Sequence, residues 1–363
     1  MDFAFNSDQE ELRRSVRGFL ERESPTSYVQ AMEDDERGFT DAVWDRIVDL
    51  GWPALLVPET AGGLGLGLVD MVVVMEEMGR VPFPGPYFSS AVFATLAARH
   101  LALDDQLESL GSGATRGTVA LEEAGAGDPV TRVRTRAVRK SGTWRLTGEK
   151  PIVLDGHTAD WALVVARAEH GIGTFLVEAP VGELVPAWDV TRKVARLTFD
   201  GREAEPVGPA VDQTRLWQRI VDDTNVATCA ELVGSMETAN ALAVEYAKVR
   251  EQFGRPIATF QAIKHKAADM LHRLELARVG THYAAWAADV DDDVRAEAAA
   301  MAKASVAEAA NYVTAESIQI HGGVGFTWEC QAHLHYRKAK QADLLLGYQG
   351  WQRQRLADLI LDG

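Results

Sequence analysis

Two short segments in the C-terminal half of the sequence combine residue types that could bind a phosphate. The first begins with Arg-Glu-Gln-Phe-Gly-Arg-Pro at positions 250–256 and continues to Gln261, and the second runs from Gln319 to Phe326 and contains the pair Gly322-Gly323. An arginine offers several N–H donors in a fixed geometry, and glycines let a ligand approach the backbone closely. Either segment alone could be a helix end followed by an ordinary turn. Together they form a more specific pattern, which favours a bound phosphate-containing ligand.

Three other candidate motifs fail on their spacing. The glycine-rich run at positions 62–67 does not fit the dinucleotide-binding fingerprint and is predicted to be a tight turn between helices. His333 and His335 are one residue apart and would point to different faces of a helix, so no metal site is expected. Ser235 lies in a predicted helix without a nucleophile elbow, so hydrolase chemistry has no support.

Composition and charge narrow the classes of protein further. The 363 residues carry a formal net charge of −16, which argues against binding to nucleic acid or to an anionic membrane. Cys229 and Cys330 are the two cysteines, and they allow at most one disulfide, so a reducing compartment is expected. The polar start predicts no signal peptide, and the apolar stretches are too short to cross a bilayer. We therefore expect a cytoplasmic protein without a membrane partner.

The hydrophobic periodicity predicts three regions and an α+β fold. Residues 1–110 show helical spacing, residues 111–209 contain short β-branched and aromatic runs, and residues 210–363 return to long helical patterns. The strand-like runs follow one another without helices between them, so the sheet is predicted to be antiparallel. Long helices with short connections predict a four-helix bundle at the C-terminus. The predicted strands cover residues 143–147, 161–165, 174–177 and 194–199.

Nearly the whole chain resembles the acyl-CoA dehydrogenase family. The resemblance includes the helical, β and helical layout, the two C-terminal segments, Gly148-Glu149-Lys150, and Pro58-Glu59 followed by the glycine-rich run. It implies a flavoprotein that oxidises the Cα–Cβ bond of an acyl-CoA thioester. In such enzymes a carboxylate removes the α-proton while the N5 atom of FAD accepts the β-hydride.

The residues that hold one half of FAD in the family are all matched in this sequence. In the family, six positions in the two C-terminal segments hold the ADP half of an FAD that belongs to a neighbouring subunit. The matching residues in this sequence are Arg250, Phe253, Gln261, Gln319, Gly322 and Gly323.

The half of the site that a family subunit uses for its own flavin departs from the family pattern. Glu122 stands where a hydroxyl would donate a hydrogen bond to the flavin, and Ile152 and Leu154 replace a tryptophan and a threonine or serine. An ionised carboxylate only accepts hydrogen bonds and would oppose the negative charge of a reduced flavin. These departures predict a defective flavin-ring site.

The family's catalytic base is also missing. An ungapped count places Leu346 at its position, and a small insertion would place Gln349 there. The alternative base position of the family is occupied by Thr224. None of these side chains can abstract a proton from a thioester. Among nearby carboxylates, a displaced base is possible, but solvated acidic residues at helix ends are the preferred interpretation of Asp222, Asp223 and Asp343.

Three hypotheses follow from the resemblance. The favoured one is the base-lacking subunit of an α2β2 acyl-CoA dehydrogenase, in which a homologous partner supplies the catalytic Glu; the stretch at 326–329 is similar to members that act on steroid side-chain CoA thioesters in steroid degradation. The second is a self-sufficient homotetrameric acyl-CoA dehydrogenase with an unconventional base. The third is a redox-inactive acyl-CoA-binding or scaffold protein. The first two imply FAD, an acyl-CoA substrate and an electron-transfer acceptor.

Overall fold

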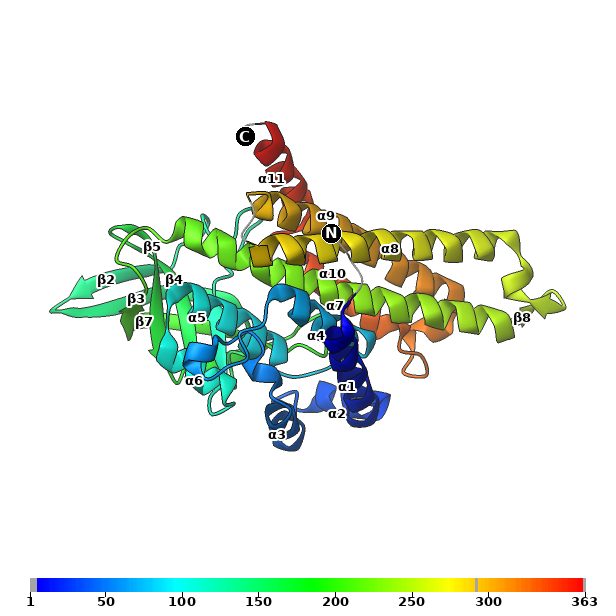
Figure 1. Cartoon of the computed structure of the whole chain (residues 1–363), viewed down its shortest axis with the longest axis horizontal. Coiled ribbons are helices and arrows are strands. Elements are labelled where there is room, and N and C mark those ends of the chain that lie inside the picture. The colour runs from blue at the N-terminus through cyan, green and yellow to red at the C-terminus, as the bar shows by residue number, and fades with distance from the viewer. Residues whose placement is uncertain (1–4, 291–292, 362–363) are drawn as a thin grey trace.

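The computed structural model describes residues 5–290 and 293–361 of the chain. Its elements are helices, then strands, then helices again, as the periodicity predicts (Figure 1). The buried run from Met71 to Gly79 makes α4 the central helix of the N-terminal group, which agrees with the continuous apolar pattern there. The N-terminal elements are α1 (Ser7–Glu23), α2 (Thr26–Asp34), α3 (Asp41–Asp49), η1 (Trp52–Ala54), η2 (Glu59–Ala61), α4 (Leu68–Arg80), η3 (Tyr87–Ala94), α5 (Thr95–Leu101) and α6 (Asp104–Gly111).

The strands form a single seven-stranded sheet in which the four predicted strands are confirmed. The pairs β3–β7, β4–β5 and β5–β7 are antiparallel, but β1 pairs with β4 in parallel, so the sheet is mixed. Parallel neighbours need a long connection, and the chain through β2 and β3 provides it. The strands are β1 (Gly117–Ala120), β2 (Arg136–Lys140), β3 (Thr143–Leu154), β4 (Trp161–Ala168), β5 (Gly171–Glu178), β6 (Gly182–Val185) and β7 (Val194–Val207).

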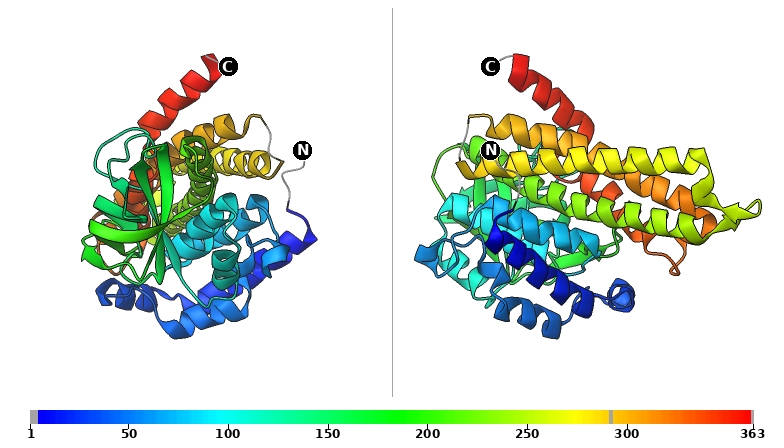
Figure 2. Two further views of the ribbon diagram at one scale, coloured as in Figure 1. Left: turned by 90° about the vertical axis from the view of Figure 1, so that its left-hand side faces the viewer. Right: turned by 45° about the vertical axis from the view of Figure 1, so that its right-hand side comes forward.

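The C-terminal helices lie side by side and extend beyond the rest of the molecule, while the last helix projects from them (Figure 2). A short hairpin connects α7 to α8 at the far end of this bundle, away from the sheet (Figure 1). In the described ranges, no helix is both long and apolar enough to cross a bilayer. The elements are α7 (Thr214–Val249), β8 (Glu251–Gln252), β9 (Arg255–Pro256), η4 (Ile257–Thr259), α8 (Gln261–Val290), α9 (Arg295–His321), η5 (Gly322–Phe326), α10 (Ala332–Leu344) and α11 (Gln349–Leu361).

Helix α7 joins the N-terminal helices to the bundle by a very close contact with α4. A Cβ atom on Gly79 would lie 1.9 Å from the carbonyl oxygen of Glu231, and one on Gly234 would lie 1.8 Å from that of Glu76. Only glycine can occupy positions where two helix backbones approach this closely. The two glycines therefore set the separation of α4 and α7.

A buried ionic group ties the loop before β7 and helix α10 to α7. Glu231 accepts a hydrogen bond from Arg192 at 2.6 Å and another from Lys338 at 2.8 Å. Burial opposes the ionisation of Glu231, but the two nearby cations outweigh it and lower its pKa to about 2. The carboxylate is therefore charged at neutral pH and holds the three segments together.

Candidate functional site

The residues of the two segments predicted to bind a phosphate lie at the same end of the bundle. Helix α7 runs towards the hairpin and ends at Val249, α8 starts back at Gln261, and α9 ends nearby at His321 (Figure 1). The rings of Tyr246 and His321 are 4.6 Å apart, which holds the ends of α7 and α9 together. Segments about 60 residues apart in the sequence thus meet at one surface, because antiparallel helices return the chain to the same end.

All six candidate residues at this end are exposed to solvent. The Arg250 guanidinium makes no hydrogen bond or ion pair with any residue of 5–290 or 293–361. A Cβ atom on Gly322 or Gly323 would meet nothing within 4 Å, so their backbone is open to a ligand. The surface therefore offers an uncommitted cation beside accessible backbone, which suits a phosphate group.

The two residues at the turn explain the conformation of the hairpin that presents Phe253. Phe253 and Gly254 form its two-residue turn with φ values of 56° and 76°, and β8 and β9 pair on either side. Positive φ at both turn residues matches the twist of antiparallel strands. Phe253 is 93% exposed, and its ring lies nearly perpendicular to that of Phe260, with the two centroids 6.0 Å apart. A large apolar side chain is thus held in water at the tip of the bundle.

Glu122 lies far from this surface, where the sheet meets the C-terminal helices. It lies two residues after the end of β1, is 6% exposed, and accepts the backbone N–H of Leu346 at 2.7 Å. Its second carboxylate oxygen pairs with the Arg132 guanidinium. Burial raises the pKa of Glu122 above its usual range, and Arg132 and the Leu346 N–H act against that rise. A buried acceptor therefore occupies the position where the family pattern has a hydroxyl donor.

Leu346 is fixed by its backbone as well as by its side chain. Its φ of 54° is unusual for a leucine, and its carbonyl oxygen accepts from Asn225 at 3.0 Å and from Gln352 at 3.4 Å. The side chain is 3% exposed and faces an apolar cavity of about 20 Å³, which also contacts Thr228 on α7. A cavity of this size holds about one water molecule. This cavity is too small for an acyl chain.

The other two positions considered for a base have structural partners of their own. Thr224 is buried, and its hydroxyl donates to the carbonyl oxygen of Ile220 at 2.7 Å. Gln349 begins α11, and both its backbone N–H and its side-chain amide donate to Asp343, at 3.0 and 2.9 Å. Neither side chain faces the cavity beside Leu346.

The expectation that Asp222 and Asp223 are solvated residues at a helix end is wrong. Helix α7 begins at Thr214, two turns earlier, so both carboxylates lie inside the helix and each is 3% exposed. Asp222 pairs with Arg355, and its buried position raises its pKa to about 6. Asp223 pairs with His100 and with Arg295, each at 2.7 Å. Asp343, by contrast, is half-buried and accepts from the Asn311 amide as well as from Gln349.

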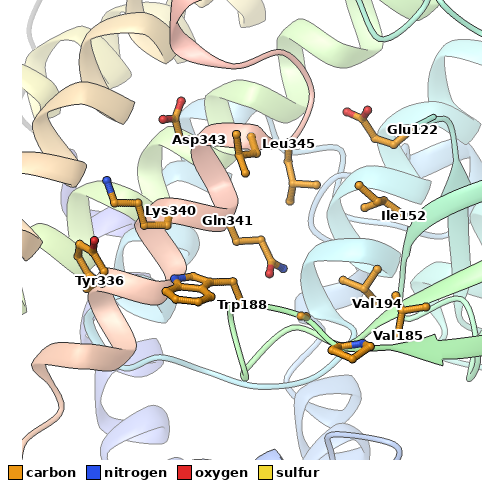
Figure 3. Close-up of a pocket in the computed structure, with 13 residues that line it drawn as sticks. Glu122, Ile152, Val185, Trp188, Val194, Tyr336, Lys340, Gln341, Asp343 and Leu345 are labelled. Carbon is orange, nitrogen blue, oxygen red and sulfur yellow. The ribbon is translucent and has the colours of Figure 1, made fainter. Parts of the chain in front are cut away.

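A larger pocket of about 530 Å³ opens on the other side of Glu122 and Ile152, between the sheet and α10 (Figure 3). Trp188, from the loop after β6, reaches across it towards α10. Nothing in the residue pattern of this loop indicates a ligand, so the loop is not predictable as part of a site from the sequence. The lining residues are Glu122, Ile152, Val185, Pro186, Ala187, Trp188, Val194, Tyr336, Lys340, Gln341, Asp343, Leu344 and Leu345.

Lys150, from the Gly-Glu-Lys motif, supports the strand end next to Glu122. Its ammonium donates to the carbonyl oxygen of Leu121 at 3.0 Å and to Glu123 at 2.7 Å. Complete burial lowers the pKa of Lys150 to about 8, although Glu123 opposes the shift. The motif thus has a structural role here: it fixes the segment that carries Glu122.

Comparison with known proteins agrees with this architecture. The family model for the acyl-CoA dehydrogenase N-terminal domain matches residues 6–106, and the model for the acyl-CoA dehydrogenase C-terminal domain matches residues 215–361. The chain therefore belongs to the acyl-CoA dehydrogenase family, whose members are FAD-dependent oxidoreductases.

Individual relatives extend over almost the whole chain. "Acyl-CoA dehydrogenase IpdE2" of Mycobacterium tuberculosis is 30% identical over 340 residues, which cover 93% of each protein. Among solved structures, a variant of the Tcur3481-Tcur3483 steroid ACAD has a TM-score of 0.90 at 31% identity over 98% of both chains. The ChsE4-ChsE5 complex from Mycobacterium tuberculosis has a TM-score of 0.90 at 27% identity over the full length of both chains.

The residues present fit one half of FAD and not the other. At the hairpin end, the free Arg250 guanidinium and the open backbone at Gly322 suit the ADP half. At the sheet, the buried Glu122 carboxylate and the aliphatic Ile152 present no side-chain donor to a flavin ring. This chain therefore has residues that suit the ADP half of FAD, whereas Glu122 and Ile152 do not suit the flavin ring.

Proposed function

We propose that this chain is the base-lacking subunit of a heteromeric acyl-CoA dehydrogenase. It contributes the ADP side of an FAD site, while a homologous partner contributes the cradle for the flavin ring and the catalytic Glu. The complex has α2β2 composition and catalyses α,β-dehydrogenation of an acyl-CoA thioester. The main support is the replacement of the family's base by Leu346, whose backbone is bound by the Glu122 carboxylate.

The separation of the two half-sites supports sharing between chains. Thr228, near the middle of α7, borders the cavity beside Leu346, and Arg250 caps the C-terminal end of the same helix. At 1.5 Å per residue, these 22 residues of α7 span about 33 Å. The hairpin end is therefore remote from the segment that carries Glu122 and Leu346, which supports a role for its exposed residues at the FAD site of another subunit.

Within the assembled site, this chain's residues would act by binding and orientation. The Arg250 guanidinium would neutralise and grip the pyrophosphate, and Phe253, Gln261, Gln319 and the Gly322-Gly323 backbone would surround the remainder of the ADP half. Bound FAD supplies the hydride-accepting flavin ring. No proton transfer is assigned to this chain, since its candidate carboxylates Asp222, Asp223 and Asp343 are all engaged by other side chains.

The substrate class is proposed from similarity. A solved structure that is 31% identical is described as a steroid ACAD, so we propose a steroid side-chain CoA thioester as the substrate. Electrons would leave the flavin to a separate electron-transfer acceptor. The acidic composition and the two free cysteines, Cys229 and Cys330, are consistent with a cytoplasmic location.

The test is the visible absorbance spectrum of the chain purified alone and after co-expression with a Glu-containing homologue. We expect a colourless lone chain and a yellow complex with one FAD for each pair of subunits. A yellow lone chain that acyl-CoA bleaches would contradict the proposal and favour a self-sufficient enzyme. A stable complex without flavin would contradict it in the other direction and favour a redox-inactive scaffold.

A further inference from the structure

The turn between α9 and α10 brings a cysteine and a histidine together beside the exposed hairpin end of the bundle. We propose that Cys330 and His321 form a reactive thiol–imidazole pair, at which a peroxide oxidises the thiol to a sulfenic acid. The pair adjoins Gly322, so the oxidised group would lie beside the surface to which the proposed function assigns the ADP half of FAD. The chemistry of the pair itself does not depend on that assignment.

The local structure holds the two side chains in contact. His321 ends α9, and η5 follows it directly, so that the chain turns back and Cys330 arrives next to His321 just before α10 begins. The backbone N–H of Cys330 donates to the carbonyl oxygen of Thr327 at 3.0 Å, which fixes the end of this turn. The Cys330 thiol then hydrogen-bonds to the His321 imidazole.

The imidazole is oriented to accept a proton from the thiol. The Nδ1 atom of His321 lies 2.7 Å from the carbonyl oxygen of Ser317. A carbonyl oxygen only accepts hydrogen bonds, so Nδ1 carries a proton, and Nε2 of the neutral ring is left as the acceptor. The ring is 6% exposed and packs against the Tyr246 ring, which limits its rotation. A base that is held in place by a third group is the arrangement that activates cysteine nucleophiles.

The surroundings of Cys330 favour its thiolate form. Burial alone would raise the pKa of the thiol, but the hydrogen bonds with His321 and with the Ala332 N–H, which lies 3.5 Å from Sγ, outweigh it and lower that pKa. Ala332 is the first residue of α10, so its N–H belongs to the positive end of the helix dipole. Burial also opposes a charged imidazole, yet the hydrogen bonds to Cys330 and Ser317 raise the pKa of His321. Both shifts favour a thiolate beside an imidazolium.

The second cysteine of the chain offers an internal comparison. Cys229 is completely buried in α7, and this burial raises its pKa to about 12. Cys330, by contrast, is partly exposed. A reactive cysteine needs both thiolate character and access for the reagent. We therefore expect oxidation at Cys330 and not at Cys229.

The oxidation step balances with hydrogen peroxide as the oxidant. Nε2 of His321 takes the proton of the thiol, and the thiolate sulfur attacks one oxygen of the peroxide. A sulfur–oxygen bond forms, the O–O bond breaks, and the imidazolium returns its proton to the departing hydroxide, which leaves as water. Two electrons pass from sulfur to the peroxide, which gives a sulfenic acid on Cys330. An external thiol can reverse this product through a mixed disulfide.

The test treats the full-length lone chain in its native state with hydrogen peroxide in the presence of dimedone, which traps sulfenic acids. Mass spectrometry of the digested protein then counts and locates the adducts. We expect one dimedone adduct per chain, on Cys330, and none on Cys229. A Cys330→Ser variant should give no adduct.

A second measurement tests the role of His321 through the rate of alkylation by iodoacetamide, which reacts with the thiolate. Each unit by which the pKa of a thiol falls gives about ten-fold more thiolate below that pKa but an about three-fold weaker nucleophile, so the net gain is about three-fold. His321→Phe should therefore slow alkylation about three-fold or more at about pH 6.5 and leave it within about two-fold at about pH 9.5. A change in exposure alone would alter both rates by the same factor.

His333→Phe is the matched control, because it makes the same substitution three residues beyond Cys330. The two ring nitrogens of His333 have no hydrogen-bond partner among residues 5–290 and 293–361, so the change removes no bond to the thiol. Both alkylation rates should stay within about two-fold of the parent.

Three results with the parent chain would overturn the inference, and none of them requires a variant to fold. They are the absence of sulfenic acid on Cys330, equal labelling of Cys229 and Cys330 in the native state, and an alkylation rate that falls about ten-fold per pH unit below pH 8, as expected for an ordinary thiol. These measurements use neither flavin nor a partner subunit. A failure here is therefore distinguishable from a failure of the proposed function.

Discussion

The contact between Glu122 and Arg132 provides a direct test of how the flavin-ring position of this chain is closed. In a Glu122→Gln variant, one carboxylate oxygen is replaced by an N–H donor. Both neighbours of Glu122, the Arg132 guanidinium and the Leu346 N–H, are donors, so one of them must lose its acceptor. The substitution therefore leaves either a cation or a backbone N–H without a partner in a buried region.

The burial and the contacts of Arg132 determine how much stability the Glu122→Gln variant should lose. Removal of one partner from a fully buried ion pair costs about 3–5 kcal/mol. Arg132 is 16% exposed and keeps a hydrogen bond to the carbonyl oxygen of Gly127 at 3.3 Å, so part of its charge remains solvated. We therefore expect the free energy of unfolding to fall by about 2–3 kcal/mol, at or slightly below the lower limit of that range.

Urea denaturation followed by circular dichroism measures this change, with the slope against urea expected to stay constant. The matched control is Glu183→Gln, the same substitution at a surface residue that is 74% exposed, which should change stability by less than about 0.5 kcal/mol. A double variant with Arg132→Leu should lose less stability than the sum of the single variants, by about 1–2 kcal/mol. A Glu122→Gln effect no larger than the control, or strict additivity, would refute the reasoning.

Four further outcomes follow from the same structure. Arg250→Lys should lower the FAD content of the assembled complex, since an ammonium lacks the two-pronged contact; unchanged flavin absorbance would remove Arg250 from the site. Gln349→Ala and Thr224→Ala should leave the turnover of the complex nearly intact, and a loss of several orders of magnitude in an acyl-CoA-dependent dye-reduction assay would show that the active site is misplaced. Leu346→Glu should give no turnover by the lone chain. It should also lower the free energy of unfolding, measured in urea, by about 3 kcal/mol, because it removes a buried leucine and brings a second carboxyl group beside Glu122. Dye reduction by this variant would contradict the closed cavity. Because the pKa of Glu231 is lowered to about 2, its ionisation stabilises the fold above about pH 4.5, and up to about 3 kcal/mol is lost as the pH falls towards 2; the stability gap between the parent and Glu231→Gln, followed by urea denaturation, should narrow over that interval and not above it.

The fold could be predicted from the sequence where periodicity carries the information. The long apolar pattern of α4 and the strand-like runs in β3, β4, β5 and β7 have clear periods, and the structure confirms them. Strand β2 was missed because its sequence, Arg-Ala-Val-Arg-Lys, is mostly polar and only Ala137 in it is buried. The parallel pairing of β1 was missed for another reason, since pairing direction depends on the path of the chain and not on residue types.

Only the parts of the candidate site that lie in local sequence motifs could be predicted from the sequence. The absence of a carboxylate at Leu346 is visible in the sequence, but its hydrogen bond to Glu122 joins residues 224 positions apart and has no sequence signature. The start of α7 is close to the predicted one, but the burial of Asp222 depends on packing against residues as distant as Arg355, 133 positions away, which has no sequence signature. The prediction that six residues hold the ADP half of FAD stays a prediction, although the structure brings all six to one exposed end.

The link between Glu122 and Leu346 also bears on how this lineage can evolve. A reversion of Leu346 to Glu alone would place two carboxyl groups side by side in a buried space, and a reversion of Glu122 to a hydroxyl residue alone would strand Arg132. Each single change is therefore expected to destabilise this chain. Substitutions made one at a time therefore cannot easily convert these two positions to the family's pattern.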